Sequence, residues 1–233
     1  MSDMVTLFSG LAVKGVLEAT VLPAFTEETG IEVQPTYEPT KVLERLVSEG
    51  ARPDVFLGVA PAVQQLAAAE VLDEGNLQPL VRSGIGLAVA PGVSGPRIGT
   101  VEELVDALRS ARSVAYSRTG ASGVYFASLL DRLGIAEEVN ERATVLAGGF
   151  TGEALLDGRA DLAVQQVIEL KAVEGVHVVG PLPDDIQQHV ELWAGAATGA
   201  LAPAQRLLTF LTSPAAVRAY GEVGLDPVVA ERT

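Results

Sequence analysis

The sequence predicts an α/β protein built around a largely parallel sheet. Short apolar, β-prone runs alternate with longer amphipathic segments along the 233 residues, which is the pattern of repeated βαβ units. Turn and helix-capping signals separate many of these runs, as expected where strands pass into helices. With 48% hydrophobic and 20% charged residues, the composition is that of a globular protein, and the length suffices for one large or two small domains.

The first half of the chain opens with an apolar strand whose end is marked by Ser9-Gly10. Gly30 provides a C-cap for the helix that follows. Thr100 and Glu103 form a capping-box signature at the start of a later helix. The predicted strands of this half are residues 5–8, 31–37, 54–58 and 84–90, and the predicted helices are residues 11–28, 41–49, 61–71 and 101–110.

The second half continues the alternation of strands and helices, without an internal repeat or a long linker. A Gly-containing turn at residues 118–123 follows the strand that ends at Ser117, and Gly148-Gly149 precedes another helix. The predicted strands are residues 113–117, 143–146, 161–166, 176–179 and 190–197, and the predicted helices are residues 124–133, 136–142, 151–156, 204–211 and 214–223.

Charge and composition exclude several classes of partner. A net charge of −14 opposes binding to nucleic acid or to an anionic membrane surface. No run approaches the ~18 apolar residues of a membrane span. Cysteine is absent, and His177 and His189 lack acidic neighbours at ligand spacing, so we expect no metal and no cofactor.

The N-terminus shows no basic segment, long apolar segment and cleavage site in succession. We therefore expect a cytoplasmic protein from the chain as written. A periplasmic or extracellular location is expected instead if a signal peptide was removed, and an ABC permease is then the expected partner.

Small and hydroxylated residues recur where predicted strands pass into helices. They stand at Ser9-Gly10, Pro39-Thr40, and residues 58–61, 117–123 and 148–151. In an open α/β sheet these turns share the carboxyl edge, where helix N-termini present free N–H groups and the positive end of the helix dipole. Ordinary N-caps would explain any one of these turns, whereas their recurrence predicts a site for a small anion.

Other chemical motifs are weak or absent. There is no phosphate-binding loop of the Gly-x-x-x-x-Gly-Lys-Ser/Thr type, and residues 120–123 depart from a hydrolase elbow at its first position. Arg118 is the candidate for a bidentate anion contact. Gln166, at the end of an apolar strand, is expected to face a polar cleft. Glu38, Lys41, Tyr125 and Glu169 lie at or near the same edge, where solvated surface positions are the commoner outcome.

The order and spacing of these turns resemble those of type 2 periplasmic-binding-fold proteins of the molybdate-binding-protein-like group. The resemblance covers nearly the whole chain, and within it the Val164-Gln165-Gln166 pattern is nearer the branch that includes aconitate isomerase. The segments that show the resemblance to this family are residues 8–10 with 12–17, residues 53–55 with Gly58, residues 115–117 with 122–126, residues 163–166, and residues 208–214.

The resemblance implies two lobes joined by two chain crossings, with a ligand cleft between them. Lobe 1 would comprise residues 1–81 and 193–233, and lobe 2 residues 82–192. Ligand contacts carried over from the family are Ser9, Gly10, Thr40, Ser122, Gly123 and Gln166. Arg118 and Tyr125, which lie at the same turn, are neighbouring candidates for ligand contact.

Two departures from molybdate binders favour an organic ligand. The first turn reads Phe8-Ser9-Gly10-Leu11 rather than Ala-Ala-Ser, and Glu38-Pro39 replaces the small residues of the second turn. We therefore expect a di- or tricarboxylate and an isomerase acting on an unsaturated carboxylic acid by a proton shift, with Glu38 as a candidate base. A non-catalytic solute-binding protein of an importer for oxyanions or carboxylates, and a ligand-sensing module, are the alternatives.

Overall fold

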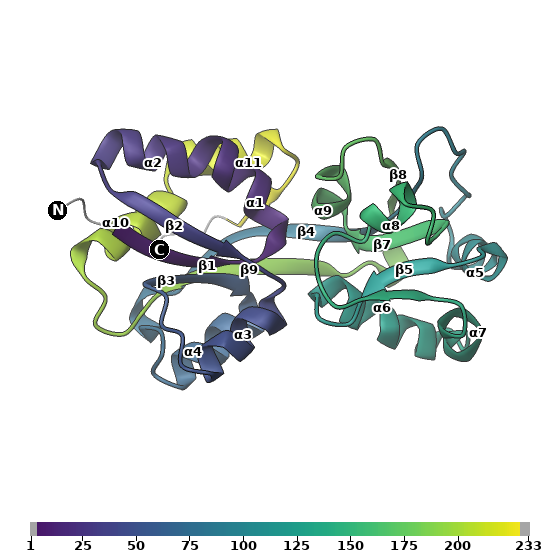
Figure 1. The fold of residues 1–233 in the computed structure, drawn as a ribbon, viewed down its shortest axis with the longest axis horizontal. Helices are drawn as coiled ribbons and strands as arrows, with labels where there is room; N and C mark the ends of the chain where they lie inside the picture. The colour runs from purple at the N-terminus through teal and green to yellow at the C-terminus, as the bar shows by residue number, and fades with distance from the viewer. Residues whose placement is uncertain (1–3, 229–233) are drawn as a thin grey trace. The chain divides into compact units, whose positions relative to one another are not determined.

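The computed structural model describes residues 4–228, and these divide into two compact units. Of the described residues, unit 1 comprises residues 4–82 and 191–228, and unit 2 comprises Ser83–Val190. Two long strands contain residues of both units: β4 (Gln78–Val89) and β9 (His189–Ala196). The α/β class predicted from the sequence is confirmed for each unit (Figure 1).

Unit 1 contains a mixed sheet in the order β2-β1-β3-β9-β4, with β10 paired to β4. The first three strands are parallel, whereas β9 is antiparallel to β3 and β10 is antiparallel to β4. The prediction of a largely parallel sheet was therefore only partly correct. The strands not yet given are β1 (Met4–Ser9), β2 (Glu32–Tyr37), β3 (Val55–Val59) and β10 (Asp226–Pro227).

Helices cover both faces of the unit 1 sheet (Figure 1), with α1, α2 and α11 on one face and α3 and α4 on the other. The first helical run changes its winding three times, from a 3-10 turn at Leu11–Val13 through α1 and a π-helical segment at Leu17–Val21 to α2. The helices are α1 (Lys14–Val16), α2 (Leu22–Thr29), α3 (Thr40–Ser48), α4 (Ala60–Ala68), α10 (Ala202–Leu211) and α11 (Pro214–Glu222).

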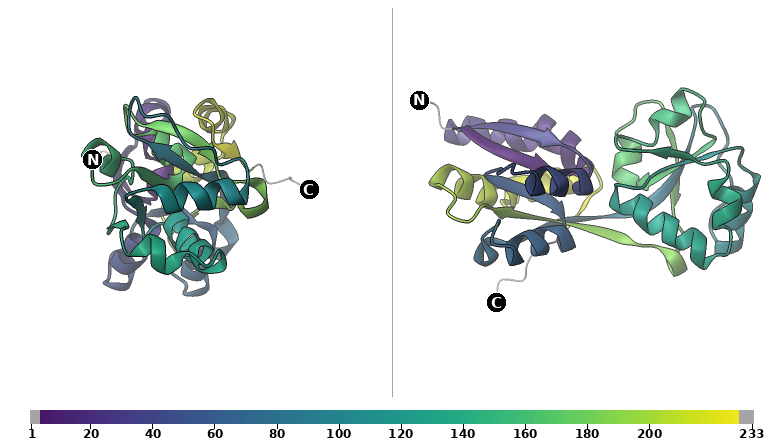
Figure 2. Two further views of the ribbon diagram at one scale, coloured as in Figure 1. Left: turned by 90° about the vertical axis from the view of Figure 1, so that its right-hand side faces the viewer. Right: turned by 60° about the horizontal axis from the view of Figure 1, so that its bottom comes forward.

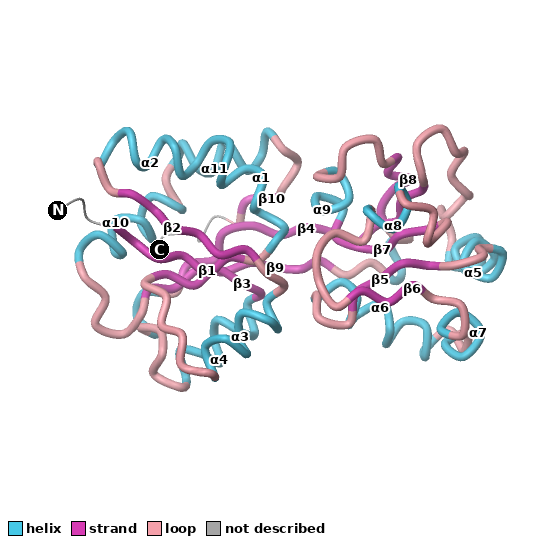
Figure 3. Tube along the Cα trace, in the orientation of Figure 1, coloured by secondary structure: helices cyan, strands magenta, loops and turns pink. Residues whose placement is uncertain are grey.

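Unit 2 is built on the strands β4-β7-β5-β6, with β8 also paired to β4. β5 is parallel to β6 and β7, and β4 is antiparallel to β7 and β8. Figure 3 shows several short helices between long loops in this unit. The elements are β5 (Val114–Ser117), β6 (Thr144–Leu146), β7 (Leu162–Gln166), β8 (His177–Pro181), α5 (Val101–Ser110), α6 (Ala121–Arg132), α7 (Ala136–Asn140), α8 (Glu153–Leu156) and α9 (Val167–Lys171).

Alternation along β7 explains why this strand reads as a continuous apolar run. Leu162 and Val164 pack into a core with Phe126 of α6, while Ala163 packs into a second core with Leu155 of α8. Successive side chains of a strand point to opposite faces, so both faces of β7 are covered by helices. Figure 2 shows the ribbon from two further directions.

The element boundaries differ from the predictions in a few places. β4 begins at Gln78 rather than at residue 84, and its Val81 and Arg82 pair with Pro227 and Asp226 of β10. α6 begins at Ala121 rather than at residue 124, so Ser122 and Gly123 lie inside its first turn. α9 was not predicted, since five residues are too few to show helical periodicity. No helix within residues 4–228 is long and apolar enough to cross a membrane.

Candidate functional site

In unit 1 the ends of three parallel strands lie side by side. Ser9, the last residue of β1, is in register with Tyr37 at the end of β2 and with Leu57 near the end of β3. Each strand passes directly into a helical segment: the 3-10 turn after Gly10, α3 after Pro39, and α4 after Val59. The predicted clustering of strand ends at one edge is therefore present within unit 1.

Thr40 occupies the centre of this edge. It is the first residue of α3, its side chain is buried, and its Oγ1 accepts a 3.4 Å hydrogen bond from the Val59 N–H. A Cβ atom added to Gly58 would lie 3.4 Å from Thr40 Oγ1, and one added to Gly10 would lie 3.8 Å from it. The Thr40 hydroxyl therefore lies next to the turns that contain Gly10 and Gly58, and neither glycine adds a side chain there.

None of the three helical segments at this edge has a side chain capping its N-terminus. Gly10, Pro39 and Val59 occupy the N-cap positions, and none of them forms a side-chain cap hydrogen bond. The first N–H groups of a helix have no acceptor within the helix, and the helix dipole makes this end attractive to anions. Three sets of such donors in one place can hold an anion without an arginine.

Ser9 and Gly10 contribute mainly through the backbone. The Ser9 side chain is completely buried and its hydroxyl donates to the Gly10 carbonyl oxygen at 3.1 Å, while the Gly10 N–H donates to the Leu57 carbonyl oxygen at 2.9 Å. These bonds fix the turn and leave the following N–H groups, from Leu11 onward, as the donors. Gly10 itself lies close to Thr40 without contributing a side chain.

Three further side chains surround the end of β2. Glu38 is half-buried, and its backbone N–H donates to the Ser9 carbonyl oxygen at 3.2 Å. Burial, with the nearby Glu18 carboxylate, raises the pKa of the Tyr37 phenol, whose buried hydroxyl has no hydrogen-bond partner within residues 4–228. The Lys14 ammonium lies 5.5 Å from the centre of the Tyr37 ring. Lys14 therefore adds a positive charge that its position in the sequence did not predict.

In unit 2, the N-terminus of α6 forms a second group of donors. Its N-cap residue, Gly120, forms no side-chain cap bond, and buried Ser122 makes no side-chain hydrogen bond within the described part of the chain. The preceding turn is fixed by Ser117, whose Oγ accepts from the N–H groups of Thr119 at 3.2 Å and Gly120 at 3.4 Å.

Gly123 allows α6 to pack directly against the end of β5. A Cβ atom at this position would lie only 1.5 Å from the Ser117 carbonyl oxygen, which no rotamer change can relieve because the obstructing atom belongs to the backbone. Gly123 is thus required for packing, whether or not its N–H group also meets a ligand.

Arg118 and Tyr125 differ from each other in their surroundings. Arg118 is exposed and forms no ion pair with any described residue. Tyr125 donates its hydroxyl hydrogen to the Ile186 carbonyl oxygen at 2.5 Å, and the Arg132 guanidinium lies 5.2 Å from its ring centre. The only hydrogen that the Tyr125 hydroxyl can donate is therefore already used within unit 2.

The two glutamines at the end of β7 have different partners. Gln165 Oε1 accepts from the N–H of Thr151 at 2.7 Å and from its hydroxyl at 2.9 Å, so Gln165 holds the loop before α8. Gln166 points to the opposite face by strand alternation. Gln166 is 5% exposed and is the N-cap residue of α9, where its side chain accepts from the Glu169 N–H in a capping box.

Glu169 is buried, although its sequence position suggested a solvated surface group. Its side chain is 6% exposed, and Oε2 accepts a 3.3 Å hydrogen bond from the Gln166 N–H. Burial raises the pKa of this carboxyl to about 7, although hydrogen bonds from the backbone and side chain of Gln166 and from the side chain of Gln165 oppose the increase. Tertiary burial of this kind leaves no signal in a five-residue helical segment.

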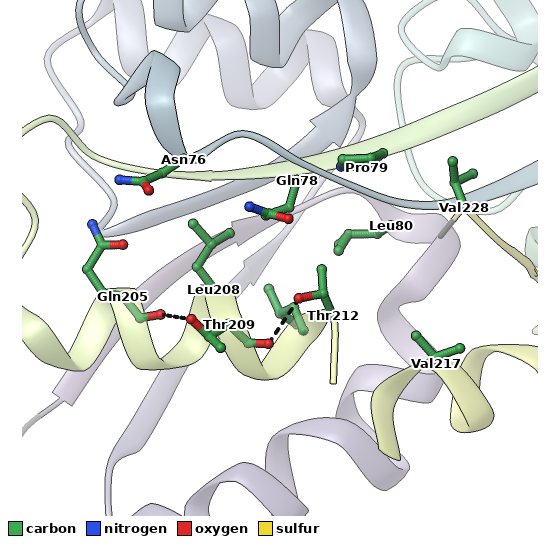
Figure 4. Close-up of a pocket in the computed structure, with 11 residues that line it drawn as sticks. Asn76, Gln78, Pro79, Leu80, Gln205, Leu208, Thr209, Thr212, Val217 and Val228 are labelled. Atoms are coloured by element: carbon green, nitrogen blue, oxygen red, sulfur yellow. Dashed lines mark hydrogen bonds between the residues drawn. The ribbon is translucent and has the colours of Figure 1, made fainter. Parts of the chain in front are cut away.

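Unit 1 also contains a cavity of about 420 Å³ between the start of β4, α10 and α11 (Figure 4). Its polar lining is neutral, and the hydroxyls of Thr209 and Thr212 donate to helix carbonyl oxygens at 2.9 and 3.1 Å. Because no charged residue lines this cavity, it offers less to an anion than the strand ends do. The described residues also contain no cluster of three or more His, Asp or Glu side chains suited to a metal ion.

Comparison with known proteins decides the family. Residues 5–226 match the family model described as bacterial extracellular solute-binding protein. The chain belongs to this family. It is also 30% identical, over 235 aligned positions, to an aconitate isomerase from Pseudomonas sp., with 97% of this chain and 88% of that protein covered. The resemblance inferred from the sequence is therefore confirmed.

Solved structures show the same fold at lower sequence identity. The periplasmic molybdate-binding protein of Azotobacter vinelandii superposes with a TM-score of 0.79 at 18% identity, covering 97% of this chain and 100% of that one. The sulfate-binding protein SubI of Mycobacterium tuberculosis gives 0.76 at 18% identity, covering 97% and 87%. These likenesses confirm the predicted type 2 periplasmic-binding fold.

Proposed function

We propose that this protein binds a small di- or tricarboxylate and isomerises an unsaturated carboxylic acid by moving a proton. Two findings support the proposal: the 30% identity to an aconitate isomerase over nearly the whole chain, and the donors at the strand ends of unit 1. Fold alone would not suffice, because one fold supports many functions.

The observation that carries the binding half of the proposal is the arrangement around Thr40. Three uncapped helix N-termini adjoin its hydroxyl, and together they present N–H donors in several directions. A tricarboxylate has separate anionic groups that can each use one set of donors, whereas a compact oxyanion needs a single set. With a net charge of −14, attraction to any anion has to be local.

The proposed isomerisation requires that one proton leave the methylene carbon. A second proton must then be added at the other end of the allylic system, on the former alkene carbon. A base takes the proton from the methylene carbon, the electron pair spreads over the double bond and the adjoining carboxylate, and a proton then arrives at the former alkene carbon. N–H donors at helix N-termini stabilise the negative charge that develops. We propose Glu38, half-buried beside Ser9, as the base of this step.

The test is a proton NMR assay of purified protein with cis- and trans-aconitate. We expect interconversion by the wild-type protein and a rate at least ~100-fold lower for Glu38→Gln, because general acid–base catalysis contributes about that much. Glu49→Gln, at the exposed end of α3, is the matched control and should behave as wild type. Lack of conversion of every unsaturated acid in a broad panel would refute the isomerase proposal.

A second candidate function is a non-catalytic solute-binding protein that serves an ABC importer. It is favoured by the family description, bacterial extracellular solute-binding protein, and by structural neighbours that include the substrate-binding domain of a putative molybdenum ABC transporter from Clostridium difficile. Saturable binding without turnover, together with recovery of the native protein outside the cytoplasm, would favour this function. Turnover by protein recovered from the cytoplasm would favour the isomerase.

A further inference from the structure

The side chain of Gln187 pairs with the backbone of β4 inside unit 2. Its Oε1 accepts from the Ile85 N–H at 2.9 Å, and its Nε2 donates to the Ile85 carbonyl oxygen at 3.0 Å. Ile85 is fully buried and lies next to Gly86, which pairs with the last residue of β8. The Gln187 amide therefore takes the place of a further β8 residue, because a side-chain amide carries both a donor and an acceptor, as a peptide group does.

The Gln187 amide is fully occupied by hydrogen bonds within unit 2. Its Oε1 also accepts from the Gln188 N–H at 2.9 Å, and its Nε2 also donates to the Leu182 carbonyl oxygen at 3.4 Å. The four bonds use both acceptor sites of the oxygen and both hydrogens of the nitrogen. Gly84 leaves room for the amide, since a Cβ atom there would lie 3.3 Å from Gln187 Nε2. Gln187 therefore holds its own chain and has no hydrogen-bonding capacity left for a ligand.

The residue that Gln187 holds lies opposite a predicted ligand contact. Ile85 is the register partner of Gln166, the last residue of β7. Gln166 is also the N-cap residue of α9, and the carboxyl end of a strand is where α/β sheets bind ligands. The Gln187 amide therefore fixes the strand that adjoins the end of β7.

The preceding residue, Ile186, holds α6. Its carbonyl oxygen accepts from the Tyr125 hydroxyl at 2.5 Å, and both residues pack against the same core of unit 2. Tyr125 belongs to α6, whose first turn contains the predicted contacts Ser122 and Gly123. Residues 186–187 therefore contact both parts of unit 2 that are predicted to bind the ligand.

We infer that Gln187 is a positioning residue, which keeps the end of β7 and the N-terminus of α6 in the arrangement that binds the ligand. This inference rests on the proposed function, in that it needs a small anion to bind the contacts predicted for unit 2, and it adds a residue that acts without touching that anion. Replacement of Gln187 by leucine keeps much of the side-chain volume and removes both hydrogen bonds to Ile85. The buried Ile85 N–H then lacks this acceptor, so β4 and residues 186–187 shift to find other partners.

Isothermal titration calorimetry of the whole, folded chain compares wild type with Gln187→Leu and with the control Gln188→Leu. The probes are trans-aconitate, cis-aconitate, molybdate and sulfate. For the probe that wild type binds most tightly, we expect Kd to rise at least ~10-fold in Gln187→Leu, because displacement of binding groups by about 1 Å is costly. Gln188 is exposed, so we expect Gln188→Leu to keep the wild-type Kd.

Hydrogen exchange followed by mass spectrometry, without any ligand, measures the positioning itself. We expect the backbone N–H groups of residues 121–125 and 166–169 to exchange at least ~10-fold faster in Gln187→Leu than in wild type, because local opening becomes easier. Exchange in α5 should stay at its wild-type rate and serves as the internal control. A purely structural role would lower the urea midpoint of Gln187→Leu but leave the Kd of the folded protein unchanged.

The outcomes separate this inference from the proposed function. If wild type binds aconitate and Gln187→Leu keeps the wild-type Kd, the inference is wrong and the carboxylate proposal stands. If wild type prefers molybdate or sulfate, the carboxylate proposal fails, while weaker binding of that oxyanion by Gln187→Leu supports the positioning role. If wild type binds none of the four probes, both fail.

A second variant keeps the test decisive if Gln187→Leu does not fold. Gln187→Glu retains an acceptor for the Ile85 N–H and loses the donor to the Ile85 carbonyl oxygen. We expect a raised Kd and faster exchange in this variant as well. A wild-type Kd in Gln187→Glu would overturn the inference.

Discussion

Glu169→Gln should remove a pH dependence of stability that arises from a single carboxyl group. Burial raises the pKa of Glu169 from 4.5 to about 7, so between these values the native state binds a proton that the unfolded chain does not. The stability that this proton provides is therefore complete below pH 4.5 and is lost as pH rises through about 7. The difference corresponds to about 3 kcal/mol, since each tenfold change in proton affinity is worth about 1.4 kcal/mol.

Urea unfolding followed by far-ultraviolet circular dichroism at pH 4.5 to 8 measures how the free energy of unfolding changes with pH. Other groups titrate in the same range, but they cancel when the free energy of unfolding of Glu169→Gln is subtracted from that of wild type. We expect this difference to change by about 3 kcal/mol across the range in favour of the variant at high pH, and to stay constant for Glu174→Gln. A constant difference for Glu169→Gln would refute the assignment of a buried, proton-binding carboxyl.

Three further variants test individual contacts. Thr40→Val should weaken carboxylate binding in isothermal titration calorimetry by about 10- to 100-fold, the worth of a hydrogen bond to a charged group, while Thr40→Ser should retain it; equal affinities would exclude a role for the hydroxyl. Gly123→Ala should lower the free energy of unfolding by about 3 kcal/mol or more, because the backbone has to move. Gly221→Ala is the control, since Gly221 has open space around it, and it should raise the free energy of unfolding by about 0.5–1 kcal/mol. Gln165→Leu should cost about 1–3 kcal/mol by leaving the buried Thr151 N–H without an acceptor, and an unchanged urea midpoint would contradict this.

Much of the fold could be predicted because local signals agree with tertiary structure. Ser9-Gly10 and Thr40 follow apolar runs, and the structure places them at the ends of adjacent parallel strands. Gly30 ends α2 with a left-handed backbone, as its position predicted. The antiparallel strands were harder, because β4 and β9 carry no sign of their direction in their own residues.

The parts of the candidate site that sequence did not reveal depend on tertiary burial. Val167–Lys171 reads as a short polar-apolar segment, and nothing in it shows that the Glu169 carboxyl folds back onto the Gln166 N–H. Lys14 follows the first turn by four residues, but its proximity to Tyr37 arises only when β1 and β2 pair. Gly123 was assigned to ligand contact, and its close approach to Ser117 appears only in three dimensions.

The central claim is that the strand ends of unit 1 select an organic carboxylate. Isothermal titration of wild type against trans-aconitate, cis-aconitate, molybdate and sulfate tests it most directly. We predict saturable binding of an aconitate isomer at least ~10-fold tighter than of either oxyanion, a difference of about 1.4 kcal/mol, and its weakening by Thr40→Val. Tighter binding of molybdate or sulfate than of any carboxylate would contradict the claim.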